Sequence, residues 1–131
     1  MMTKTTTESD QLRRFVIEAA QLASDRHCED VIVLDVRGLS QVCEYVLLAS
    51  GTSDRQMRTV ADELEKLGKE YNHPPFRSSV DSASTWIVVD FVDAVAHFFE
   101  PNQRAYYDLE SLWSDAPTVP WQRSREETSS S

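Results

Sequence analysis

Cysteine and glycine are scarce in this chain, whose 131 residues include two Cys and three Gly. So few cysteines exclude a disulfide-stapled scaffold. Cys28 and Cys43 lie fifteen positions apart, without the Cys-x-x-Cys or Cys/His spacing of a zinc site. We therefore expect two reduced, largely buried thiols, no bound metal and no other cofactor.

Long apolar runs are also missing. No stretch approaches the ~18 residues of a membrane span, and the first residues contain no apolar segment of the signal-peptide type. Glu8 and Asp10 precede the first arginine, which argues against a mitochondrial transit peptide. We expect a cytoplasmic protein that does not contact a membrane.

Positive charge is in short supply, because 13 Lys and Arg stand against 22 Asp and Glu, a net charge of −9. Residues 114–131 contribute only −1 of this, so the acidity belongs to the folded body. Nucleic-acid binding depends on Lys and Arg replacing counterions on phosphates. This composition argues against direct, specific binding of RNA or DNA and favours a basic protein partner, with charge steering the encounter.

Two segments show apolar residues at three- and four-residue spacing, which is the signature of amphipathic helices. One is expected to begin after a cap at Ser9 or Asp10, the other after a Ser53/Gln56 capping box, with Gly68 near its end. The apolar stripes are Leu12, Phe15, Val16, Ala19, Leu22 and Ala23, and Met57, Val60, Ala61, Leu64 and Leu67.

Two apolar runs rich in β-branched residues, 31–34 and 45–49, predict strands covered on both faces, so helices must flank the sheet. Runs 86–89 and 94–99, joined tightly through 90–93, predict an antiparallel hairpin, and 77–80 a short edge strand. Pro101 is expected to open a last short helix. A flexible lead-in (1–9) and a disordered tail (117–131) leave 10–116 as one domain.

One enzymatic interpretation starts from Gly51-Thr52-Ser53, between a predicted strand and a predicted helix. This turn looks like the place where nucleotidyltransferases hold a triphosphate. Such chemistry needs two metal ions on carboxylates, usually a pair two residues apart on the next strand. The next acids, Asp62 and Glu63, are adjacent within a helix and diverge. A simple helix cap is therefore favoured over a catalytic loop.

A second enzymatic interpretation pairs His97 with Asp90 or Asp93 as acid and base. His97 lies in the middle of a predicted strand, on the same face as Val95 and Phe99. No candidate nucleophile accompanies it. A hydrogen-bonded structural or interface histidine is therefore the favoured interpretation, and we expect a protein that is not an enzyme.

Aromatic residues are concentrated in the second half of the chain. They are Trp86, Phe91, Phe98, Phe99, Tyr106, Tyr107, Trp113 and Trp121. Many belong to the core, but the hairpin-tip Phe91 and the residues around Tyr107 cannot easily all be inside. Exposed Trp and Tyr are enriched at protein interfaces, so a docking surface is expected here.

Four sequence blocks, in their order and spacing, resemble the ribosome silencing factors, also called Iojap-like proteins. They are DVIVLDVRGLS (30–40), SGTSDRQ (50–56), WIVVD (86–90) and RAYYDLESLW (104–113). The resemblance implies an α/β (α+β) fold, a mixed β-sheet flanked by helices, which is nucleotidyltransferase-like without the catalytic carboxylates.

The resemblance also implies a translational repressor. Such a protein would bind the large-subunit ribosomal protein L-fourteen and sterically block joining of the small and large ribosomal subunits. A nucleotidyltransferase-like enzyme and a ribosome-assembly adaptor of the large subunit stay open as alternatives. Members of the family often self-associate, which leaves a homodimer open as well.

The family's docking surface maps onto the hairpin and the last helix. The matching residues are Trp86, Phe91 and Tyr107, with Asp90, Asp93 and His97 in the same hairpin. Val92 stands where the family usually has Gly at the hairpin tip. If that position requires a positive φ, the turn of this chain must differ or carry strain.

Overall fold

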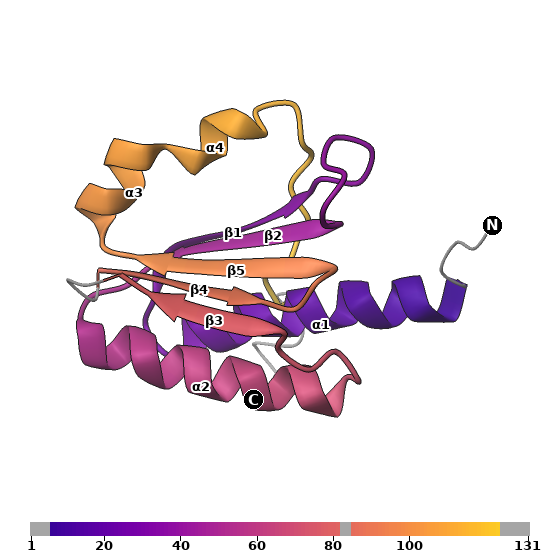
Figure 1. Ribbon diagram of the computed structural model, residues 1–131, viewed down its shortest axis with the longest axis horizontal. Helices are drawn as coiled ribbons and strands as arrows, with labels where there is room; N and C mark the ends of the chain where they lie inside the picture. The colour runs from indigo at the N-terminus through magenta and orange to yellow at the C-terminus, as the bar shows by residue number, and fades with distance from the viewer. Residues whose placement is uncertain (1–5, 82–84, 124–131) are drawn as a thin grey trace.

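Helices cover both faces of a five-stranded sheet in the part of the chain that the structure describes, residues 6–81 and 85–123 (Figure 1). The structure is a computed structural model. Its elements are α1 (Thr6–Asp25), β1 (Glu29–Asp35), β2 (Tyr45–Ser50), α2 (Asp54–Glu70), β3 (Arg77–Val80), β4 (Trp86–Asp90), β5 (Ala94–Phe99), α3 (Pro101–Tyr107) and α4 (Leu109–Leu112). The predicted fold class is confirmed.

The strands are arranged in the order β1-β2-β5-β4-β3. β2 and β5 run parallel, whereas the other neighbouring pairs are antiparallel, so the sheet is mixed. β2 is buried along its whole length, as its continuous apolar run predicts. The predicted hairpin of β4 and β5 and the predicted edge strand β3 are confirmed.

The larger core lies between one face of the sheet and the pair α1 and α2. Leu12 and Phe15 of α1 and Met57 and Leu64 of α2 are fully or almost fully buried there. Burial of one such side chain contributes roughly 1.5–3 kcal/mol, so the two stripes supply much of the stability. Both predicted stripes are confirmed, although Leu22 is only partly buried.

α1 begins earlier than predicted. Its backbone is helical from Thr6, so the expected cap at Ser9 or Asp10 is wrong, and both residues lie inside the helix. The flexible lead-in is wrong for residues 6–9, and residues 1–5 lie outside the described part.

A smaller core occupies the opposite face of the sheet. Its buried residues include Leu34 of β1, Leu48 of β2 and Phe99 of β5, and Leu109 and Trp113 pack on them. The helix predicted to open at Pro101 is confirmed. Its continuation is interrupted by a left-handed residue at position 108, which separates α3 from α4. The last helices therefore cover the β1, β2 and β5 side of this face.

A buried arginine anchors α3 to the sheet. Arg104 donates from one guanidinium nitrogen to the Asp30 carbonyl at 2.6 Å and to the Ser50 hydroxyl at 2.9 Å. Its Nε lies 3.1 Å from a Glu110 carboxylate oxygen. A buried guanidinium is tolerated only with such partners. The network thus fixes α3 and the start of α4 relative to β1 and β2.

The C-terminal segment is ordered further than predicted. The Asp35 N–H donates to the Pro117 carbonyl at 2.9 Å, and the Val119 N–H donates to Val33 at 2.8 Å. Val119 is buried, and the Trp121 indole donates to a β1 carbonyl at 3.1 Å. The expected disorder is wrong for residues 117–123, because an edge strand offers backbone groups that this segment satisfies. Residues 124–131 lie outside the described part.

Gly68 makes room for the chain that follows α2. The helix continues past it to Glu70, so Gly68 does not end it. A Cβ at this position would lie 2.5 Å from the His73 carbonyl oxygen and 2.7 Å from Phe91 Cε1. The His73 N–H also donates to the Gly68 carbonyl at 2.7 Å. Close approach of the backbone therefore requires glycine here.

We expect Gly68→Ala to lower the free energy of unfolding by about 1–3 kcal/mol, because a backbone oxygen and a core ring must both move to admit the methyl group. Urea denaturation followed by circular dichroism measures this loss. Lys69→Ala, at the exposed neighbouring position, is the control and should change stability by less than about 0.5 kcal/mol. Equal stabilities for the two variants would contradict the tight contact.

Candidate partner-binding surface

The second face of the sheet is left open on β4 and on the neighbouring part of β5. Buried and half-buried residues alternate along β4, with Ile87 and Val89 buried toward α1 and α2. The residues between them point to the opposite face. The register places Val88 opposite His97. We name the resulting surface the open face; its members are Trp86, Val88, Asp90, Val95 and His97, all half-buried.

A hydrogen bond between Trp86 and His97 organises the centre of the open face. The Trp86 indole Nε1–H donates to His97 Nδ1 at 3.2 Å. Burial lowers the pKa of His97 from 6.5 to about 4, so the imidazole is neutral at pH 7 and Nδ1 is free to accept. His97 therefore holds the indole in place, which supports the structural or interface histidine favoured above.

The hairpin tip carries the strain that the missing glycine predicts. Val92 has φ 74°, a conformation in which a β-branched residue is a genuine outlier. The turn is held by a hydrogen bond from the Val92 N–H to the Asp90 carboxylate at 2.7 Å, and by one from the Asp93 N–H to the Phe91 carbonyl at 2.9 Å. The backbone at this position thus has the geometry that glycine adopts most readily. The Val92 residue is 54% exposed.

Phe91 does not line the open face, which corrects the sequence prediction. Its side chain is only 3% exposed and belongs to the core beneath the sheet. Its ring makes an edge-on contact with Phe15 at a centroid distance of 5.0 Å. The period of two along β4 continues to this position, so Phe91 follows Ile87 and Val89 to the inner face.

The remaining predicted residues are placed as follows. Asp90 lies on the open face, and Asp93 lies at the adjoining tip, where its carbonyl accepts the Glu44 N–H at 2.7 Å. Tyr107 is the last residue of α3, and its side chain is outside the described part. The structure therefore brings Trp86, Asp90 and His97 together. Sequence reasoning missed Val88, which the alternation along β4 identifies.

The open face lies in the most acidic part of the chain. Residues 81–116 contain seven acidic residues and one basic residue, a net charge of −6 out of −9. The basic residue is Arg104, which is buried and paired with Glu110. On the neighbouring strand β3, the exposed Arg77 lies opposite Asp90 in the register. The net charge of segment 81–116 still favours a basic partner.

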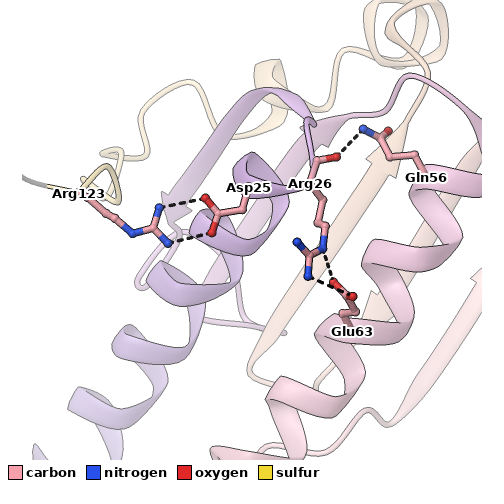
Figure 2. Close-up of polar contacts among 5 residues, drawn as sticks. All are labelled: Asp25, Arg26, Gln56, Glu63 and Arg123. Atoms are coloured by element: carbon pink, nitrogen blue, oxygen red, sulfur yellow. Dashed lines mark hydrogen bonds and ion pairs between the residues drawn. The ribbon is translucent and has the colours of Figure 1, made fainter. Parts of the chain in front are cut away.

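The turn that resembles a phosphate loop is closed by the chain itself. The Gly51 N–H donates to the Phe99 carbonyl at 3.0 Å, and the Thr52 N–H donates to Gln56 Oε1 at 2.7 Å. Gln56 in turn donates to the Arg26 carbonyl at 2.9 Å, as Figure 2 shows. Two N–H groups that would face a phosphate are therefore already satisfied, which argues against the nucleotidyltransferase interpretation.

The predicted Ser53 cap of α2 is confirmed, because its hydroxyl accepts the Gln56 N–H at 3.0 Å. Of the two acids that follow this turn in the sequence, Glu63 is engaged in an ion pair. Arg26 binds Glu63 at 2.8 Å, beside the pair of Arg123 and Asp25 at 2.9 Å (Figure 2). Within residues 6–81 and 85–123, no three His, Cys, Asp or Glu residues gather closely enough to hold a metal ion.

The two cysteines are free and buried, as predicted. Burial raises the pKa of Cys28 to about 11 and also raises that of Cys43. Thiols of this kind are structural rather than reactive. None of the helices in the described part is long and apolar enough to cross a membrane.

A family model described as "Ribosomal silencing factor during starvation" matches residues 9–131 of this chain. The chain belongs to the ribosomal silencing factor family. Proteins named ribosomal silencing factor in Halalkalibacterium halodurans and Bacillus subtilis are each 36% identical to it. The matches span 101 and 99 residues, or 77% and 76% of this chain and 86% and 84% of the relatives.

A solved structure supports the same assignment. The crystal structure of a Chromobacterium violaceum protein superposes with a TM-score of 0.72 at 27% sequence identity, covering 85% of this chain and 92% of that one. The family resemblance drawn from the four sequence blocks is therefore confirmed. This ribosomal silencing factor thus carries an open sheet face and a closed loop where an enzyme would bind phosphate.

We expect Val92→Gly to raise the free energy of unfolding by about 0.5–1 kcal/mol. Relief of left-handed strain is worth about 1–2 kcal/mol, and the extra entropy of glycine in the unfolded chain offsets about half of it. Thermal and urea denaturation measure the gain. Val42→Gly, at an exposed loop residue without a positive φ, is the control and should bring no gain. A less stable Val92→Gly protein would refute the assignment of strain.

Stability should fall as the pH drops from 6.5 toward 4, because His97 binds a proton in the unfolded chain near pH 6.5 but in the folded protein only near pH 4. Below this window the loss levels off. His97→Asn retains an acceptor for the Trp86 indole and cannot titrate. Between pH 7 and pH 5, urea denaturation should show a wild-type loss larger by on the order of 2 kcal/mol than that of the variant. Parallel losses would show that His97 is not the group responsible.

Proposed function

We propose that this ribosomal silencing factor represses translation in the cytoplasm by binding the large ribosomal subunit through ribosomal protein L-fourteen. Once bound, it blocks the approach of the small subunit by occupying the space between the two. The proposal is supported by the family match together with the open face, an apolar surface within the acidic part of the chain.

The chemistry of the open face suits a protein partner. Trp86, Val88 and Val95 give it an apolar centre, and tryptophan is among the residues that contribute most to binding at interfaces. The net negative charge of segment 81–116 favours a basic ribosomal protein over ribosomal RNA. Steric exclusion requires no reacting group, which agrees with the closed phosphate-like loop.

The test combines binding and subunit joining. Purified protein is sedimented with isolated large subunits, small subunits are then added, and the fraction of joined ribosomes is measured. Wild type should co-sediment and reduce joining. Val88→Lys, which places a cation in the apolar centre, and Tyr107→Ala should each weaken binding at least about 30-fold, as loss of a hot spot does.

Thr59→Lys is the matched control, because it adds the same charge on an exposed position of α2, across the sheet from the open face. It should bind and block joining as wild type does. Failure of wild type to bind large subunits would reject the proposal. Binding to large-subunit precursors without any effect on joining would instead favour an assembly adaptor.

A further inference from the structure

Exposed apolar side chains gather at one end of the sheet. Four of the six large hydrophobic residues that are exposed in the described part of the chain lie in loops at this end. Their exposed fractions are 52% for Leu39, 81% for Val42, 65% for Phe76 and 54% for Val92. We name these four residues the loop rim.

Hydrogen bonds join the three loops that carry the rim. The Glu44 N–H donates to the Asp93 carbonyl at 2.7 Å, which links the loop between β1 and β2 to the hairpin tip. The Phe76 N–H donates to the Asp90 carbonyl at 2.7 Å, which links the segment before β3 to the end of β4. Figure 1 shows these loops at the same end of the sheet, on the right. The rim is therefore a connected border, running along the ends of all five strands.

The loop rim is continuous with the open face. Asp90 belongs to the open face, and its carboxylate accepts a hydrogen bond from the N–H of Val92 in the rim. The open face alone is small. Its residues lie on two strands at ~4.8 Å spacing and span about five positions at ~3.4 Å, which gives a patch of roughly 160 Å² in projection. A stable complex usually buries about 800 Å² on each partner. A partner on the open face must therefore reach beyond it.

Strain at Val92 is a second, independent observation. A valine at φ 74° is costly, and its half-exposed side chain recovers little of that cost by burial within this chain. Strained residues that persist on a surface point to a function of the side chain they present. The side chain presented at the hairpin tip is that of Val92, which belongs to the loop rim and lies next to the open face.

We infer that the loop rim is the second half of the surface that binds the large ribosomal subunit, an inference that rests on the proposed function. Val42 and Val92 are buried by apolar side chains of the bound protein. The loops and strand ends that carry the rim, 35–44, 73–77 and 90–93, contain four acidic residues and two arginines. One of these, Arg37, is paired with Asp35, so the border remains complementary to a basic partner.

The test measures the affinity of the full-length protein for isolated large subunits, comparing wild type with Val42→Ser and Val92→Gly. Each variant should bind about tenfold more weakly, since one valine is no longer buried at the interface. Val92→Gly is the sharper variant, because it should weaken binding while raising the melting temperature. Val80→Ser, at an exposed valine on the other end of β3, is the matched control and should bind as wild type does.

The outcomes separate this inference from the proposed function. If wild type binds and Val88→Lys does not, but both rim variants bind like wild type, the inference is overturned and the proposed function stands. If wild type does not bind large subunits, both are overturned. If light scattering shows that the rim variants change self-association without changing affinity for the subunit, the rim is a contact between copies and the inference is overturned.

Discussion

The pleat of β4 and β5 is the constraint on which the rest of the molecule depends. Because successive side chains must point to opposite faces, the residues that complete the core with α1 and α2 fix which residues face the other way. Ile87, Val89 and Phe91 close the core, and Trp86 and Val88 are thereby presented on the opposite side. The open face is thus a direct product of the packing beneath it.

The second layer of helices is too short to cover that opposite side completely. α3 has 7 residues and α4 has 4. The core beneath them includes buried residues of β1, β2 and β5. The Arg104 network holds these helices at that side of the sheet. Incomplete cover leaves Trp86 and its neighbours on the open face partly accessible.

Most of the architecture could be predicted from sequence because it follows from local patterns. Helical stripes, the Ser53 cap and the β4–β5 hairpin depend on residues close together in the chain. The position of Phe91 was also within reach, since the period of two that buries Val89 buries Phe91 as well. The family was identified from four sequence blocks. The spacing of apolar residues predicts helices and strands, but it carries no information about binding partners.

Other features depend on contacts between distant residues and leave no local signature. Residues 117–123 contain two large apolar side chains, Val119 and Trp121, among polar residues and prolines, a composition typical of disorder. Their order comes from β1, more than 80 positions earlier in the chain. The hydrogen bond from Gln56 to the Arg26 carbonyl, 30 positions away, likewise becomes visible only in three dimensions.

The path of residues 117–123 along β1 also limits how this sheet can grow. A strand at the edge of a sheet is a template for another chain, and at β1 the C-terminal segment occupies that place, fastened to α1 by Arg123 and Asp25. Among the described strands, the opposite edge is β3, which has 4 residues. A second copy that extended the sheet would therefore have to pair with β3. Pairing with β1 would first require residues 117–123 to dissociate from that strand.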